Sequence, residues 1–192
     1  LERAVSLQDY EDFARTFSGI AKAQAVWVWD GRKRSIFLTV AGPGGEVLAE
    51  DGSVITKLKE ALRAYGDPFV AFTVKTYRQA FFRLEGTVTI HPDYVSETVM
   101  AEVTADLQRR YAFEARAFGQ PVALSEAMAA IQSIAGVVAV DIDTFARNDV
   151  PTPAIQPRLI ADRPAMGADG LVPAAELLLL DPASLTQLKA MQ

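Results

Sequence analysis

Apolar and polar positions in the first 78 residues recur with two different periods, which predicts five elements in the order α-β-β-α-β. Ser6 and Asp9 fit a capping box at the start of the first helix, and Val5 and Tyr10 are placed to close a hydrophobic staple around it. Strict two-residue alternation on both sides of Asp30-Gly31 predicts a β-hairpin. A second amphipathic helix and a further strand complete this part of the chain.

The pattern in residues 79–146 predicts a second set of elements in the order β-α-β-α-β. Alternation from Phe82 to Ile90 is typical of a strand with one solvated face, and apolar residues at four-residue spacing between Ser96 and Arg110 indicate a helix. Val138, Val140 and Ile142 alternate again near the end. The predicted fold class is therefore α+β, built from two consecutive small α/β modules that cover residues 1–78 and 79–146.

Residues 147–192 form a proline-rich C-terminal extension. Its first part is a connector poor in regular structure, and Leu177–Leu180 is a short apolar run that predicts a strand, followed by a weakly helical tail. Such a strand can pair with the chain's own sheet or with the edge of a neighbouring subunit. Pro182 limits how far the strand can extend, which favours the chain's own sheet.

The stretch 118–137, FGQPVALSEAMAAIQSIAGV, could be a ligand cradle or a packing element. Gly119 permits a turn, Ser125 is placed to cap a helix, and Gly136 is placed to end it. A phosphate-binding loop needs glycines and usually a lysine at the helix start, whereas this helix follows Pro121 and the stretch has no basic residue. We therefore interpret it as a packing element.

The residues best suited to chemistry are few, and we predict no catalytic, cofactor-binding or metal-ligating residue. His91 is the only histidine and is interpreted as a surface or hydrogen-bonded structural residue, with an enzyme that pairs it with an aspartate as a remote alternative. Asp141 and Asp143 could share a cation or a proton, but acids so spaced more often line a solvated sheet edge. Trp27 and Trp29 are expected in the core or in a buried interface rather than in a base-stacking platform.

Composition narrows the function classes further. The chain has 192 residues, and half of them are apolar, which suits an ordered globular protein. Its net charge of −5 gives no reason to expect nucleic-acid binding. The basic group Arg32-Lys33-Arg34 is expected in a solvated turn. The absence of cysteine excludes disulfides and thiolate chemistry. The sequence has no run of roughly 20 apolar residues, so no membrane insertion is expected. Because the chain starts at Leu1 rather than Met, and a helix cap follows only five residues later at Ser6, we expect it to be part of a longer protein.

Six short segments resemble, in order, a known family. Residues 4–14, AVSLQDYEDFA, and 19–23, GIAKA, resemble the segment AVSxxDYExxA, xGIxKA of the baseplate assembly proteins of the baseplate J-like family. Further segments are similar to the C-terminal half of that family: HPDY at 91–94, FGQPV at 118–122 with Ser125, GV at 136–137 and PAAELL at 173–178. The chain is identified on this basis as the C-terminal portion of such a protein.

This resemblance implies a wedge component of the baseplate in a contractile phage tail or a phage-tail-like injection particle. The implied role is structural and non-catalytic, without a cofactor, and the chain is expected to be oligomeric in the particle. The implied partners are other baseplate wedge subunits, hub or spike proteins and sheath-initiating proteins, with assembly in the bacterial cytoplasm. The alternative is a small-molecule-binding regulatory module of ferredoxin-like shape, with its pocket at the joint between the two halves.

Overall fold

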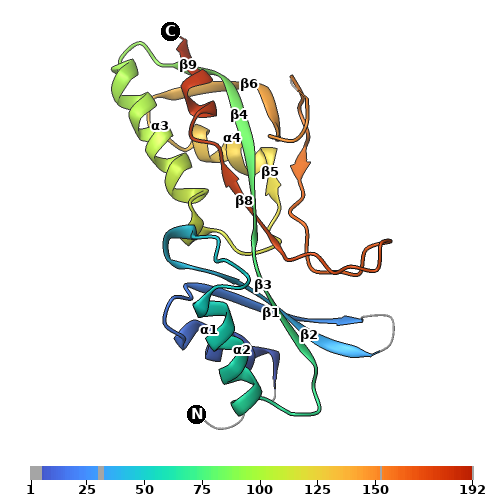
Figure 1. Ribbon diagram of the computed structural model, residues 1–192. Helices are drawn as coiled ribbons and strands as arrows, with labels where there is room; N and C mark the ends of the chain where they lie inside the picture. Colours follow the sequence, from blue (N-terminus) through green and yellow to red (C-terminus); the bar gives the residue numbers. More distant parts are fainter. Residues whose placement is uncertain (1–5, 30–32, 152, 192) are drawn as a thin grey trace. The chain divides into compact units, whose positions relative to one another are not determined.

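The computed structural model describes residues 6–29, 33–151 and 153–191 (Figure 1). The chain divides into two compact units, and each is made of two stretches of sequence. The first unit contains Leu1–Arg78 and Asp162–Glu176, and the second contains Gln79–Ala161 and Leu177–Gln192. The extension that the sequence sets apart from residue 147 onwards is thus shared between the two units.

The first unit is a three-stranded sheet with two helices packed on one face (Figure 1). Strand β2 lies at the centre, antiparallel to β1 and parallel to β3. The elements are α1 (Leu7–Thr16), β1 (Lys22–Trp29), β2 (Arg34–Ala41), the short 3-10 helix η1 (Pro43–Gly45), α2 (Ser53–Tyr65) and β3 (Phe72–Thr76).

The start of α1 confirms the predicted capping box. The Asp9 amide donates to the Ser6 hydroxyl at 3.1 Å, and the Ser6 amide donates to the Asp9 carboxylate at 2.7 Å, so two amides that lack helical partners are satisfied. Tyr10 is buried, whereas Val5, its predicted staple partner, lies outside the described residues. The Ala25 amide of β1 donates to the Glu11 carboxylate at 2.9 Å, which joins helix to strand.

The second face of this sheet is covered by the segment that returns to the first unit. Val28 and Phe37 pack against Ala174, and the Ala175 amide donates to the buried Thr39 hydroxyl at 3.2 Å. Strand β2 is therefore buried on both faces from Ser35 onwards, which explains its nearly continuous apolar sequence.

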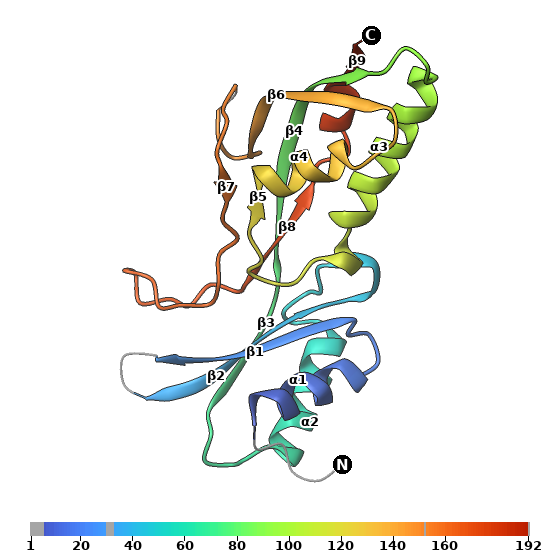
Figure 2. The ribbon, with the colours of Figure 1, turned by 180° about the vertical axis from the view of Figure 1, so that it is seen from behind.

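The second unit is built around one long strand, β4. Strand β6 pairs with β4 antiparallel along one edge, and β8 and β9 also pair with β4. Helices α3 and α4 pack together and supply the apolar faces that the sheet covers, while the short strands β5 and β7 pair with each other (Figure 2). The elements are β4 (Arg78–Ile90), α3 (Ser96–Arg110), the 3-10 helix η2 (Phe113–Ala115), β5 (Val122–Ala123), α4 (Leu124–Gln132), β6 (Val137–Arg147), β7 (Arg158–Leu159), β8 (Glu176–Leu180), the 3-10 helix η3 (Ser184–Gln187) and β9 (Leu188–Met191).

The core of the second unit joins alternate residues of β4 to the two helices. Phe82 packs edge-on against Tyr111 and against Phe145, with ring centroids 5.2 and 5.7 Å apart. The leucines of the terminal segment enter the same core. The apolar strand β8 thus belongs to the chain's own sheet, which confirms that prediction.

The α+β class is confirmed, and three local predictions need correction. Ala123, not Ser125, occupies the N-cap of α4, because the helix begins directly at the end of β5. Gly136 does not end this helix, which stops at Gln132; it lies in the turn that leads into β6. The tail after residue 183 forms η3 and the strand β9 rather than a longer helix, because β9 finds a free stretch of β4 to pair with.

Candidate functional site

The turn at residues 116–121 is held together by a buried arginine. The Arg116 guanidinium donates to the carbonyl oxygens of Gln120 at 2.9 Å and Pro121 at 2.8 Å, and it lies over the Tyr111 ring at 5.7 Å. Gly119 takes a left-handed φ of +65°, which lets the chain reverse within reach of Arg116. Burial lowers the pKa of Arg116. The motif is therefore a closed structural turn in which the cation binds backbone oxygens.

Two segments that are far apart in the sequence, 91–94 and 136–137, lie against each other. The His91 amide donates to the Gly136 carbonyl at 2.8 Å. Gly136 has φ of +91°, and a β-carbon placed there would come within 2.6 Å of the Tyr94 ring. Glycine is required for two reasons, the backbone angle and the close approach of the aromatic ring.

Gly136→Val should destabilise the fold by about 3 kcal/mol, because left-handed strain and overpacking each cost about 1–3 kcal/mol. Gly44→Val is the matched control: Gly44 has φ of +61° and no atom near its missing side chain, so it should cost only about 1 kcal/mol. Urea denaturation of both variants separates strain from packing. Equal losses would show that the Tyr94 ring moves aside freely.

The only histidine lies in an exposed turn. Its Nδ1 accepts the Asp93 amide at 3.3 Å and lies 3.5 Å from the Asp93 carboxylate, and its ring meets the edge of Tyr94. These contacts order the turn between β4 and α3. They are the contacts expected of an exposed, hydrogen-bonded structural histidine.

The paired aspartates lie on β6 but are separated by an irregularity in the sheet. Asp141 faces Thr87 across the ladder, and the register shifts between Glu85 and Gly86, so that Asp143 has no residue opposite it. Both aspartates are exposed. No group of three or more possible metal-ligating side chains occurs among the described residues.

Trp27 and Trp29 do not lie in the core, which corrects that part of the prediction. They share a face of β1 with the buried Ala25, yet their exposed fractions are 36% and 59%, against 5% for Ala25. The Arg34 guanidinium stacks over the Trp27 ring at 4.5 Å. Alternation along the strand identified the shared face correctly, but how far α1 covers that face depends on tertiary packing.

Both indoles of the chain are on this hairpin, so tryptophan fluorescence reports on this face alone. Because Lys33 and Arg34 are exposed beside them, iodide should quench the emission more strongly than caesium at equal ionic strength, despite the net charge of −5. Arg34→Glu should reverse or abolish this preference. Equal quenching of the wild-type chain by the two ions would contradict the exposed cationic setting.

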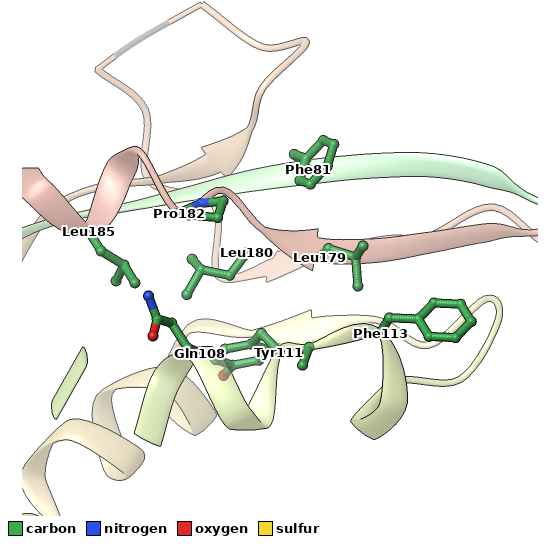
Figure 3. Close-up of a pocket in the computed structure, with 9 residues that line it drawn as sticks. Phe81, Gln108, Tyr111, Phe113, Leu179, Leu180, Pro182 and Leu185 are labelled. Atoms are coloured by element: carbon green, nitrogen blue, oxygen red, sulfur yellow. The ribbon is translucent and has the colours of Figure 1, made fainter. Parts of the chain in front are cut away.

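The second unit contains an apolar pocket of about 280 Å³ (Figure 3). Figure 3 shows Gln108 and Tyr111 on one side and Leu179 and Leu180 of β8 on the other. The complete lining is Phe81, Gln108, Tyr111, Ala112, Phe113, Leu179, Leu180, Pro182 and Leu185. The volume lies below that of typical metabolite sites, and the lining supplies no convergent set of charged groups. It suits a single apolar side chain better than a polar metabolite.

Burial raises the pKa of Tyr111 to about 12. The unfolded chain loses this proton near pH 10, so between about pH 10 and 12 the unfolded state binds fewer protons and the stability that Tyr111 contributes falls as the pH rises. Denaturation of the wild type and of Tyr111→Phe should show that the free energies of unfolding of the two proteins become more alike as the pH rises through this range. A constant difference would contradict the raised pKa.

A cluster of ion pairs within the first unit ties the start of β4 to the returning segment. The Arg78 guanidinium lies 2.7 Å from the Asp162 carboxylate and 3.1 Å from the buried Glu176 carboxylate, and it donates to the Ala174 carbonyl at 3.2 Å. The Asp162 amide donates to Glu176 at 3.0 Å. Every charge in the cluster has a partner, so we interpret the cluster as a structural contact that holds the two segments together.

The helices do not suggest a membrane span: in the described part of the chain, none combines the length and the apolar character that crossing would need.

Comparisons with known proteins found one matching family model and a solved structure of similar fold. Residues 2–75 match the model of the baseplate J-like central domain. One chain in the cryo-EM structure of the anti-feeding prophage baseplate has a similar fold, with a TM-score of 0.62 at 16% sequence identity. That match covers 93% of this chain and 38% of the baseplate chain, so this chain spans well under half of the length of the protein it resembles. No curated protein matches the sequence.

Proposed function

We propose that this chain is a structural subunit of the baseplate of a contractile phage tail or a phage-tail-like injection particle. The observation that carries the proposal is the match of residues 2–75 to the baseplate J-like central domain. The fold shared with a chain of the anti-feeding prophage baseplate supports it along nearly the whole length.

Within that assembly the proposed position is the wedge, beside hub or spike and sheath-initiating proteins. In this proposal the chain acts by binding other proteins and not by catalysing a reaction. Exposed aromatic residues of the first unit support this, because proteins that act alone seldom leave two tryptophans in water on one strand face. The ordered turns at Arg116 and Gly136 stabilise the fold, and a structural subunit needs such stable turns.

The test is electron microscopy of particles from the producing cells, with the full-length protein tagged. The label is expected at the baseplate end of each particle, and deletion of the gene should leave tubes or sheaths without baseplates. A tagged protein that is expressed but absent from purified particles would contradict the proposal.

The small-molecule alternative lacks a supporting observation. The pocket in Figure 3 is apolar and small, and the charged residues with shifted pKa values lie elsewhere or serve the Arg116 turn. We therefore propose no second function.

A further inference from the structure

The exposed face of the β1–β2 hairpin has an organisation that packing within this chain does not explain. Alternate residues of β1 share one face, and Ala23 and Ala25 on that face pack into the core beneath α1. The row continues with Trp27 and Trp29, where exposure rises to 36% and 59%. The strand thus carries its two largest apolar side chains beyond the part that the helix covers.

The hairpin cannot hide these indoles by turning over. The opposite face of the same strands is already occupied, because Val28 and Phe37 pack against Ala174. Regular pairing extends to the last described residues of the hairpin, with Trp27 opposite Ile36 and Trp29 opposite Arg34. The backbone that carries the indoles is therefore ordered, which lowers the conformational entropy that a partner must remove on binding.

The chemistry of this face indicates what it binds. The Arg34 guanidinium lies over the Trp27 ring, with Cζ 4.5 Å from the ring centroid, and its side chain is exposed to solvent, where its N–H groups can meet an acceptor. No carboxylate among the described residues forms an ion pair with Arg34. Lys33, the residue before Arg34, is also exposed.

Tryptophan and arginine are the residue types most enriched at the energetic centres of protein interfaces. An apolar side chain can pack on the indoles while a neighbouring carboxylate takes a charge-assisted hydrogen bond from Arg34. A nucleic acid could also bind these aromatic and cationic groups. The net negative charge of the chain, however, repels a long polyanion and disfavours a short acidic segment less.

We infer that Trp27, Trp29 and Arg34 form a docking face for an acidic protein segment, one that places an apolar side chain on the indoles and an aspartate or glutamate on Arg34. This inference rests on the proposed function, because the segment is assigned to a neighbouring baseplate subunit.

The experiment replaces Trp29 with the photo-crosslinking residue p-benzoylphenylalanine in the full-length protein of the producing cells. Particles are purified, irradiated and digested, and the cross-linked peptides are sequenced by mass spectrometry. The matched control carries the same residue at Leu171, which is 66% exposed in the same unit. Position 29 should cross-link to a peptide of another baseplate subunit that contains aspartate or glutamate next to an apolar residue, and position 171 should not.

A charge series gives a second measurement that does not depend on the cross-linker. Arg34→Glu should lower the copies of the protein per particle about tenfold, whereas Arg34→Lys should keep most of them. Lys57→Glu makes the same charge change at an exposed site on α2 and should leave incorporation unchanged. Circular dichroism of each purified variant shows whether the fold is retained.

The outcomes separate the two proposals. If the tagged wild-type protein is absent from particles, the proposed function fails and the docking face fails with it. If the protein is present but position 29 cross-links only within its own chain, to nucleic acid or to nothing, the docking face alone is overturned. Normal incorporation of a folded Arg34→Glu variant would overturn it as well.

Discussion

A chain that ends at Gly170 should lose the cooperative unfolding of its second unit. The deletion removes β8 and β9 together with six buried leucines, Leu177, Leu178, Leu179, Leu180, Leu185 and Leu188. Burial of one leucine contributes about 1.5–3 kcal/mol, so the set contributes about as much as the whole stability of an ordinary domain. The deletion also removes the Ser184 hydroxyl that accepts the buried Leu84 amide at 3.2 Å.

The matched control ends at Leu188 and keeps all six leucines, although it removes three of the four residues of β9. It should melt much closer to the full chain, because the side chains of Lys189, Ala190 and Met191 are exposed. Circular dichroism and hydrogen exchange of the two truncations measure the difference. A cooperative melt that survives deletion of residues 171–192 would show that the terminal segment is dispensable to the fold.

Gly86→Ala should destabilise the chain by about 4 kcal/mol or more, since a single methyl group has no room there. The register of β4 and β6 shifts at this residue, and the irregularity brings the Asp141 carbonyl oxygen over Gly86. A β-carbon on residue 86 would lie 2.1 Å from that oxygen and 2.9 Å from the Ile142 α-carbon. Both obstacles are backbone atoms, so relief requires that the two strands separate.

Gly170→Ala is the control for the loss of a glycine alone. Gly170 has φ of +75° with no atom within contact distance of its missing side chain, so its cost should be about 1 kcal/mol from backbone strain. Denaturant titration of the pair gives the difference. Similar stability losses would mean that the strands adjust around residue 86, and would remove the close approach as the reason for glycine.

The proposed structural role gives these glycines and charges a function in packing. In an enzyme, a left-handed glycine beside a histidine or a buried arginine beside a tyrosine invites a catalytic interpretation. Here Gly136 makes room for Tyr94, and Arg116 binds the carbonyl oxygens of Gln120 and Pro121. These contacts hold turns in place, and the surface they leave rigid is what a partner can recognise.

The sequence by itself determined the features that depend on neighbours along the chain. The Ser6 and Asp9 capping box, the extent of α3 and the hairpin are set by hydrogen bonds and side-chain periods within a few residues, so pattern alone predicted them. The strand character of Leu177–Leu180 followed in the same way. A family resemblance across six short segments suggested the baseplate role, because those segments follow one another in the order found in the family.

The tertiary structure alone decided what depends on distant residues. Gly136 was predicted to end a helix, but glycine is required there by the Tyr94 ring, which the fold brings from the turn before α3. Alternation placed Trp27 and Trp29 on the face of Ala25, yet whether that face is core or surface depends on where α1 ends above the sheet. Periodicity fixes the direction of a side chain, whereas burial requires a second element to cover it, and that element is positioned only by the complete fold.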